Sequence, residues 1–390
     1  MRSMKEDDKL PELSLLGGPL HRLGCRLGLV RGGTNTIWLG LAIGMSAWGV
    51  LMVLALLQGL GHKVFSLAVI GGHVRLLVVI PLFFVCEAWV VPRMDEFVRT
   101  IVRSGVVPEN ALLALQSEVE RVGRWKDSWL PEALWLLIAV LMSFLGARLL
   151  RYGATAAFDP TRAIAEGTLF AWFYWIVCMT FFRFLVFRWF WLLGLWSYLL
   201  WCVSRLKLHL VPTHPDGAAG LGYLEVVHVH FTPLIVAISA LQSASFAEEL
   251  SAGTMTFEAV YPALALMLML VAVLFLGPLF IFAPKLWACR VKGLTDYMEF
   301  ATHYVNGFDR KWLGKDEPPE EHLLGTPDLQ SLADLSNSVS IVRNMRWVPL
   351  SPRLVADLAM AALLPILPLF LLKYPVDQLA ARLFQMLTGL

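Results

Sequence analysis

Charged side chains inside long apolar runs are the first candidates for chemistry in this 390-residue chain. Arg183 lies in the run 168–206, which contains neither proline nor an acidic residue, and Glu87 lies near the end of an earlier run. An isolated arginine there costs roughly 2.5 to 3.5 kcal/mol on membrane-insertion scales, so we expect the two to pair at matching depth. Such a pair could gate an ion or proton path. It could equally tie two helices together, or Arg183 could reach lipid phosphates.

His73 and Arg75 stand near the start of the second apolar run. If they face the interior of a helix bundle, they could form a mouth that attracts anions, or could pair with Glu248, Glu249 or Glu258 from a later connection. The alternative is that both side chains only anchor the helix at the membrane interface.

A third candidate is the turn motif His214-Pro-Asp-Gly-Ala-Ala-Gly. Proline and Gly217 favour a turn, and Asp216 can cap a following helix. Gly217 and Gly220 allow close approach of the backbone. The motif therefore predicts a turn and cap at the inner face of the membrane, with catalytic use as the less favoured alternative.

Metal binding and catalysis have little support in the sequence. His214 and Asp216 precede His228 and His230, but two histidines two residues apart point to different faces of a helix. No H-E-x-x-H, Walker or G-x-G-x-x-G motif occurs, and the five widely spaced cysteines suit neither a disulfide frame nor a zinc site. We therefore assign no catalytic residue, no metal ligand and no cofactor, and expect no nucleic-acid partner.

The composition indicates which kind of secondary structure positions these residues. The chain is 57% hydrophobic and only 16% charged, against about 25% charge in ordinary soluble domains. It is therefore predicted to be an all-α, polytopic membrane protein with six or seven spans. The predicted spans are 37–60, 67–91, 131–149, 168–187, 231–247 and 260–282, followed by a seventh or re-entrant span and an amphipathic tail in 354–390.

The distribution of lysine and arginine predicts the orientation. The segments on one side hold 23 of them and the connections on the other side only 4, which places the first group in the cytoplasm. The expected cytoplasmic regions are the N-terminal segment 1–36, the helical insertions 92–130 and 189–230, and the helical region 283–353. The same distribution favours a single crossing by the run 168–206, although it would be about 58 Å long as one helix. Its remainder should then lie along the interface or extend inward against other helices.

The predicted cytoplasmic regions contain amphipathic helices. Leu112, Leu115, Val119 and Val122 recur at helical spacing in the first. A second helix should begin with Thr326 as its N-cap and Pro327 at its first position. Its apolar stripe consists of Leu329, Leu332, Leu335, Val339 and Val342.

Four stretches together resemble a family of bacterial polytopic inner-membrane proteins for which no function is established. They are GGHVRLLVVIPLFFVCEAWV at 71–90, KDSWLPEALWLL at 126–137, PTHPDGAAGLGYLE at 212–225 and LLGTPDLQSLADLSNSVSIVRNMRWVPL at 323–350. The resemblance implies a bacterial inner membrane and a polytopic architecture. It transfers no catalytic or binding residue.

The leading functional hypothesis is a channel or transporter for a small ion or solute, with Glu87, Arg183, Arg75 and His73 lining or gating the path. One alternative is a membrane-embedded enzyme that uses His214, Asp216 and His228 on a lipid or amphiphile at the inner face. The other is a non-catalytic scaffold or sensor. In each case we expect the lipid bilayer as partner, an inner membrane with the N-terminus in the cytoplasm as location, and a homo-oligomer.

Overall fold

The chain forms a bundle of long helices, and its computed structural model describes residues 33–149, 169–314 and 326–372. No strand occurs in these ranges, which confirms the all-α prediction. The predicted N-terminal segment lies almost wholly outside the described residues, as does the amphipathic end of the tail.

The helices alternate with short 3-10 and π-helical turns. The first half of the chain forms α2 (Gly33–Leu57), α3 (Gly61–Val64), the 3-10 turn η3 (Leu67–Val69), α4 (Ile70–Val74), the π-helical turn η4 (Arg75–Val79), α5 (Ile80–Arg103), α6 (Glu109–Asp127) and α7 (Trp129–Leu149). The second half forms α9 (Leu169–Trp172), the π-helical turn η5 (Phe173–Cys178), α10 (Met179–Arg205), α11 (Tyr223–Val229), α12 (Thr232–Ser251), α13 (Phe257–Phe275), the 3-10 helix η6 (Gly277–Phe282), α14 (Ala283–Trp312), α15 (Pro327–Asn344), α16 (Pro352–Leu363) and the 3-10 helix η7 (Leu364–Leu372).

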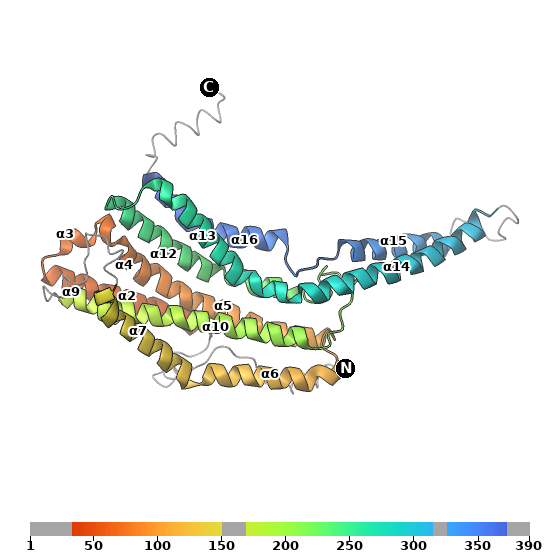
Figure 1. The fold of residues 1–390 in the computed structure, drawn as a ribbon, viewed down its shortest axis with the longest axis horizontal. Helices are drawn as coiled ribbons and strands as arrows, with labels where there is room; N and C mark the ends of the chain where they lie inside the picture. The colour runs from red at the N-terminus through yellow and green to blue at the C-terminus, as the bar shows by residue number, and fades with distance from the viewer. Residues whose placement is uncertain (1–32, 150–168, 315–325, 373–390) are drawn as a thin grey trace, which may run out of the picture.

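Two rods form the centre of the bundle and continue straight through a π-helical turn. One joins α4, η4 and α5 into 34 residues, and the other joins η5 and α10 into 33 residues. Each is about 50 Å long, against ~30 Å for the hydrocarbon core of a bilayer. The long run therefore forms a single helix over Phe173–Arg205 and not a hairpin, and the second half of this helix packs against α6. We call the end of the bundle that carries α3, α4 and α9 the distal end (Figure 1).

Two glycines let α2 approach the first rod closely. A Cβ on Gly40 would lie 2.6 Å from the Cβ of Phe84, and one on Gly44 would lie 2.2 Å from the backbone oxygen of Leu76. Both contacts are too short for any side chain, so α2 depends on these glycines. This is the G-x-x-x-G pattern by which membrane helices pack without a hydrophobic driving force.

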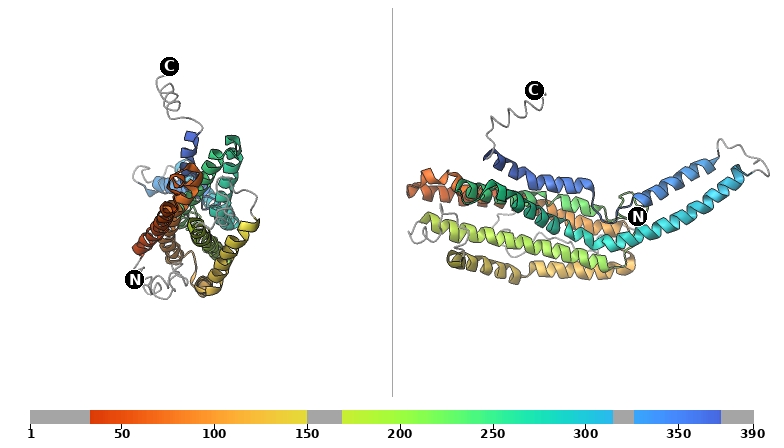
Figure 2. Two further views of the ribbon diagram at one scale, coloured as in Figure 1. Left: turned by 90° about the vertical axis from the view of Figure 1, so that its left-hand side faces the viewer. Right: turned by 45° about the horizontal axis from the view of Figure 1, so that its top comes forward.

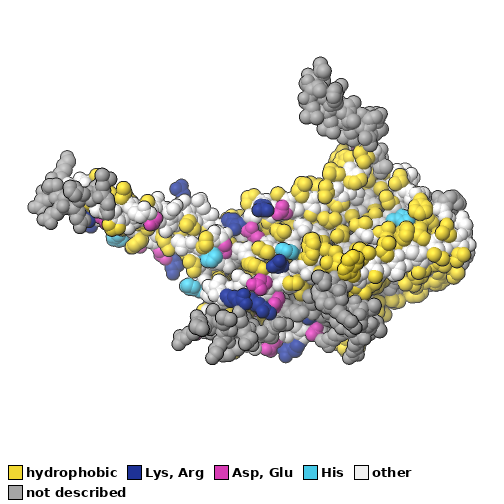
Figure 3. Space-filling view, turned by 180° about the vertical axis from the view of Figure 1, so that it is seen from behind, with side chains coloured by type: hydrophobic (Ala, Val, Ile, Leu, Met, Phe, Trp, Pro, Cys, Tyr) yellow, Lys and Arg dark blue, Asp and Glu magenta, His cyan; other side chains and the backbone are white. Residues whose placement is uncertain are grey.

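The surface of the bundle is apolar where a membrane would surround it. Six helices in the described ranges are long and apolar enough to span, and a seventh arises if α6 and α7, which meet at 41°, form one broken span. Large apolar side chains on α2, α7 and α13 are exposed, among them Leu57, Trp129 and Val273. Figure 3 shows apolar side chains covering the distal part, while charged ones gather toward α14 and α15. A soluble monomer rarely exposes so large an apolar surface.

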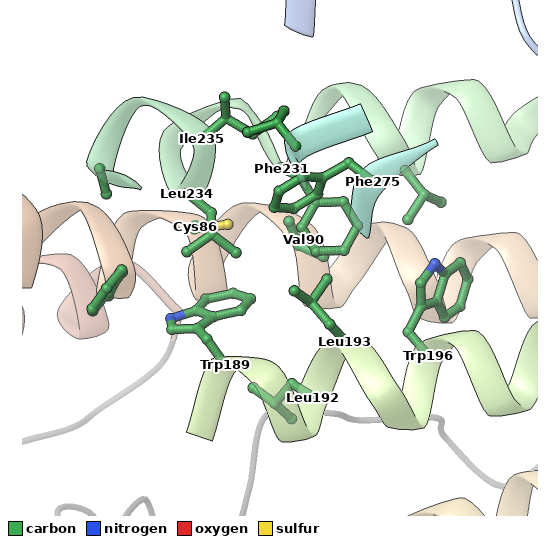
Figure 4. Close-up of a cluster of buried hydrophobic side chains, with 14 of the residues drawn as sticks. Cys86, Val90, Trp189, Leu192, Leu193, Trp196, Phe231, Leu234, Ile235 and Phe275 are labelled. Carbon is green, nitrogen blue, oxygen red and sulfur yellow. The ribbon is translucent and has the colours of Figure 1, made fainter. Parts of the chain in front are cut away.

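The core lies between the two rods and α12. Trp196 of α10 and Phe231 beside α12 are almost fully buried, and Phe275 of α13 packs on Phe231 with ring centroids 5.5 Å apart. Figure 4 shows these rings among the aliphatic side chains of α5, α10 and α12. Two tryptophans of the long run, Trp189 and Trp196, thus pack in the interior.

Beyond the bundle, α14 and α15 form a two-helix arm that projects away from the distal end (Figures 1 and 2). α15 begins at Pro327 with Thr326 in the N-cap position, as predicted. Asp328 holds the outer part of the hairpin: its carboxylate accepts hydrogen bonds from Lys311 at 2.9 Å and from the Trp312 indole at 3.1 Å. The apolar stripe of α15 is only partly covered by α14: Val342 is fully buried and Leu332, Leu335 and Val339 are half-buried, whereas Leu329 is exposed.

The last described segment returns to the bundle. Ser351 caps α16 by accepting the backbone N–H of Leu354 at 3.1 Å. The helix then narrows into η7 instead of ending, because Pro365 and Pro368 cannot donate backbone hydrogen bonds to an α-helix. Together α16 and η7 are long and apolar enough to span.

Candidate functional site

The two π-helical turns bring an arginine and a tyrosine together near the distal end. Arg75 opens η4, Tyr174 lies in η5, and Arg75 Nη1 donates a hydrogen bond of 2.9 Å to the Tyr174 hydroxyl. π-helical turns within α-helices are rare and are frequent at functional sites. The pair joins the two central rods at one level of the bundle.

Glu248 of α12 approaches the same place. Its Oε1 accepts the backbone N–H of Gly71 at 2.7 Å, and its charge interacts with that of Arg75. Of the predicted partners Glu248, Glu249 and Glu258, it is therefore Glu248 that lies near Arg75. Gly71 leaves room for both groups, since a Cβ there would lie 2.6 Å from Glu248 Oε1 and 3.1 Å from Arg75 Nη1.

His73 serves a different contact. The Trp48 indole donates to His73 Nδ1 at 2.8 Å, and His73 Nε2 lies 2.7 Å from the carbonyl oxygen of Val64. An indole can only donate, so Nδ1 must accept and Nε2 must carry the proton. These bonds fix a neutral histidine that ties α4 to α2 and α3. His73 makes no ion pair with a glutamate among the described residues.

Arg183 lies on α10 and is half-buried. Its Nη1 donates to the hydroxyl of Ser143 on α7 at 2.8 Å, and that hydroxyl lies 2.6 Å from Thr180 Oγ1. The charge of Arg75 acts on it from the neighbouring rod. Within the described residues Arg183 has no carboxylate at ion-pair distance.

The prediction that Glu87 pairs with Arg183 is wrong. Glu87 instead forms two hydrogen bonds with Arg188, of 2.7 Å from Nη1 and 2.6 Å from Nη2. Glu87 is 3% exposed and Arg188 6%, so the pair is sealed from solvent. Glu132 of α7 adds a second carboxylate 3.9 Å from Arg188 Nε.

The error arose from the assumed end of the second span. The predicted second span ends at residue 91, whereas the helix continues to Arg103. Counted from the distal ends of the two rods, Glu87 is 17 residues beyond Ile70 and Arg188 is 15 beyond Phe173, while Arg183 is only 10. Because the rods run in the same direction, similar counts place side chains at similar depth. Arg188, and not Arg183, therefore lies at the depth of Glu87.

The turn motif is a tightly ordered loop. The Asp216 carboxylate accepts the backbone N–H groups of Ala218 at 2.8 Å, Gly220 at 3.0 Å and Gly222 at 2.8 Å, and His214 Nδ1 lies 2.9 Å away. Burial by itself raises the pKa of Asp216, but these hydrogen bonds outweigh it and hold the pKa below its ordinary value. Asp216 thus organises the loop before α11 and does not cap the helix directly.

The loop also holds the base of the arm. Gly217 (φ +64°) and Gly220 (φ +98°) adopt the left-handed backbone that favours glycine, and a Cβ on Gly220 would lie 2.5 Å from Val106. Arg346 follows α15, and its backbone N–H donates a hydrogen bond of 2.8 Å to the Gly217 carbonyl oxygen. Its guanidinium group donates to the Asp216 carbonyl oxygen at 2.7 Å and to the Glu225 carboxylate. The motif is therefore a clamp between bundle and arm.

The histidines of the enzyme hypothesis do not converge with this loop. His228 is buried, with Nδ1 2.6 Å from the Phe275 carbonyl oxygen and Nε2 accepting from the Trp196 indole at 3.4 Å. His230 Nδ1 lies 2.6 Å from the Val226 carbonyl oxygen. No group of three or more potential metal ligands occurs in the described part of the chain. His214 and Asp216 contact each other within the loop, but the side chain of His228 is bonded to Phe275 and Trp196 instead, so the three residues that the hypothesis needs do not converge.

Comparisons with protein-family models, with curated proteins and with solved structures find no match. The fold and the apolar surface define the class of the protein: it is an all-α, multi-pass membrane protein. The resemblance to a bacterial inner-membrane family stays a prediction.

Sequence reasoning missed most partners at these sites. Tyr174, Ser143 and Thr180 are ordinary residues of apolar helices, and only their contacts single them out. Arg188 was visible as a charge in the long run, and counting from the distal ends of the rods would have matched it to Glu87.

Proposed function

We propose that the protein is a non-catalytic membrane scaffold that self-associates through its arm. The observation behind this proposal is an exposed apolar stripe on α14, which we call the arm stripe. It consists of Trp287, Val291, Met298 and Val305, whose exposed fractions are 54%, 47%, 54% and 38%. When the half-buried residues Leu294 and Ala301 are included, successive members of this series are four, three, four, three and four residues apart in the chain. Such a repeat is typical of a helix that packs in a coiled coil.

The arm stripe lies beside the face of α14 that contacts α15. Gly293 approaches Val342, and Tyr304 donates to the Asp328 carbonyl oxygen at 3.0 Å. Because successive residues of an α-helix are rotated by 100° about its axis, the arm stripe lies roughly a quarter turn around α14 from Gly293 and Tyr304. The hairpin therefore leaves it uncovered within the described residues.

A second copy of the chain suits this surface. On one flank of the arm stripe, Ala288, Thr295 and Thr302 are exposed and uncharged. On the other flank, Arg290 is the one charged position beside Tyr297 and Tyr304, so two arms can approach with little repulsion between like charges. The excess of lysine and arginine in this part of the chain favours the cytoplasm for the arm. Anchoring in one membrane would hold the arms of neighbouring copies at the same height, which raises their effective concentration.

Cysteine crosslinking of the full chain in native membranes tests this proposal. Met298→Cys places a thiol on the arm stripe, and Asp296→Cys places one on a different, exposed face of α14. We expect oxidation to produce covalent dimers for Met298→Cys well above those of Asp296→Cys and of the unaltered chain. Equal yields for the two variants would reject association through the arm stripe.

Passage of a small ion is the second candidate, and half-buried Arg183 favours it. Its surroundings contain no carboxylate at ion-pair distance among the described residues. Glu87 no longer supports a path, because its carboxylate is bonded to Arg188 away from solvent. Ion flux into proteoliposomes with wild type and Arg183→Gln separates the two candidates: a conduit requires flux that the substitution alters, and a scaffold gives none.

A further inference from the structure

Among the described residues, two arginines near the distal end carry more positive charge than their neighbours compensate. Arg75 and Arg183 act on each other as like charges. Glu248 is the acidic group that acts on Arg75, and one of its oxygens is already bonded to the Gly71 N–H. The polar contacts of the arginines are to the hydroxyls of Tyr174 and Ser143, which are neutral. Uncompensated charge within membrane-spanning segments marks a place where a ligand of opposite charge is stabilised.

An apolar cavity of about 180 Å³ lies farther from the distal end between the same three elements. Val79 and Phe83 line it from the first rod, Phe182 and Val186 from the second, and Leu241 from α12. A cavity of this size with apolar walls stays dry and accepts apolar molecules. Water or a free ion would find no polar partner inside it.

The arginines and the cavity are adjacent along each element. Val79 follows Arg75 by one helical turn, and Phe182 precedes Arg183 directly in the chain. On α12, Leu241 lies seven residues before Glu248, which is two helical turns or about 10 Å. One elongated molecule could therefore contact both regions, with its polar end toward the distal end of the bundle.

The cavity opens toward the surrounding membrane. Phe190 and Leu270 are part of its lining, and both are exposed, at 48% and 47%. Trp189 and Leu193 of α10 and Leu234 of α12 form inner parts of its wall and appear in Figure 4. A lipid chain could enter sideways between α10 and α13 without crossing water.

We infer that this region binds an anionic amphiphile, with its carboxylate or phosphate at Arg75 and Arg183 and its acyl chain in the cavity. An acyl chain gains little when it moves from bilayer to protein, because lipid tails are as apolar as the cavity wall. Selectivity therefore comes from the head group, where arginine can bind a carboxylate or phosphate through two parallel hydrogen bonds. This inference is independent of the scaffold proposal, since the site and the arm lie at opposite ends of the molecule.

Native mass spectrometry of the full chain in detergent tests the inference with three chain-matched probes: oleate, a monoacyl phosphatidate and a monoacyl phosphatidylcholine. We expect at least tenfold greater retention of an anionic probe than of the zwitterionic one. Stronger retention of oleate identifies a fatty acid as the ligand, and stronger retention of the phosphatidate identifies a phospholipid. Equal retention of all three probes would reject the site.

Variants separate the two parts of the site. Arg75→Gln with Arg183→Gln should reduce retention of the anionic probe to that of the zwitterionic one, whereas lysine at both positions should preserve most of it. Ala237→Phe fills the cavity from α12 and should also reduce retention. Arg310→Gln, on the exposed face of the arm, is the matched control and should change nothing. Size-exclusion profiles identify variants that fail to fold.

Two outcomes contradict the inference. Retention that survives loss of both arginine charges would show that the head group does not bind there. Displacement of the anionic probe by millimolar inorganic phosphate, combined with no effect of Ala237→Phe, would show that a free anion is the ligand and that the cavity has no part in binding.

Discussion

Glu87 and Arg188 face each other from neighbouring rods and share two hydrogen bonds of 2.7 and 2.6 Å while almost entirely removed from solvent. The paired arrangement satisfies both charges at once, which is the condition under which ionised groups persist in an apolar interior. It also fixes the register of the two rods, since a shift by one turn would separate the charges.

Breaking this pair should destabilise the protein strongly. Glu87→Gln removes the carboxylate that shares two hydrogen bonds with Arg188 and leaves the buried charge with only Glu132, 3.9 Å from its Nε, so we expect the free energy of unfolding to fall by about 3 kcal/mol. Unfolding in detergent, followed by circular dichroism, measures the loss. Arg183→Gln is the control: it removes a half-buried charge bonded to a hydroxyl and should have a smaller effect. Replacing both residues, as Glu87→Leu with Arg188→Met, should recover much of the stability; no recovery would argue against the pair as the cause.

The close approach of α2 to the first rod should be sensitive to a single methyl group. Gly44→Ala places a Cβ against the Leu76 backbone oxygen, and we expect a loss of about 1 to 3 kcal/mol from the forced separation. Gly49→Ala is the matched control, because nothing lies within 4 Å of a Cβ there. The melting temperature of Gly44→Ala should be lower than that of Gly49→Ala. Equal melting temperatures would show that the contact is not tight.

The Asp216 loop should make the base of the arm sensitive to acid. The folded protein holds the pKa of Asp216 below its ordinary value of 3.8, so the ionised carboxylate stabilises the folded state above that pH. The contribution is lost as the pH falls through the lower folded pKa. Asp216→Asn should therefore be less stable than wild type near neutral pH, and the difference should shrink toward pH 3. Asp296→Asn, which is exposed on α14, should show no such convergence.

Arg346 should restrict the motion of the arm. Its side chain reaches the Asp216 carbonyl oxygen and Glu225, both on the bundle side of the junction. Arg346→Gln should broaden the distance distribution between spin labels on exposed positions Asn337 of α15 and Val226 of α11. Arg343→Gln, three residues away and exposed, should leave the distribution narrow. Unchanged widths in both variants would mean that other contacts hold the arm.

The sequence determined the fold class because its main signals are local. Apolar length marks the spans, and the proline and N-cap pattern at Thr326 and Pro327 located the start of α15 correctly. The close contacts of Gly40 and Gly44 also correspond to a local pattern, G-x-x-x-G. Such signals need no knowledge of which helix lies beside which.

The candidate site was less accessible because it depends on contacts between distant segments. The pairing of Arg75 with Tyr174 requires two π-helical turns at the same level, and nothing in either segment alone specifies that alignment. The depth of Glu87 was misjudged because the helix extends beyond its most apolar part to Arg103. Charge spacing could place residues along a helix but could not assign their partners.

The second rod, from Phe173 to Arg205, joins the two ends of the molecule through one unbroken element. Near its start Tyr174 receives the hydrogen bond from Arg75, and just past its end the Leu206 carbonyl oxygen accepts a hydrogen bond from Lys285 in the first turn of α14. A stiff helix about 50 Å long acts as a lever: a tilt of about 5° shifts one end by about 4 Å relative to the other. A tilt of the rod where Arg75 and Tyr174 meet would therefore also move the root of the arm, because both contacts belong to the same helix.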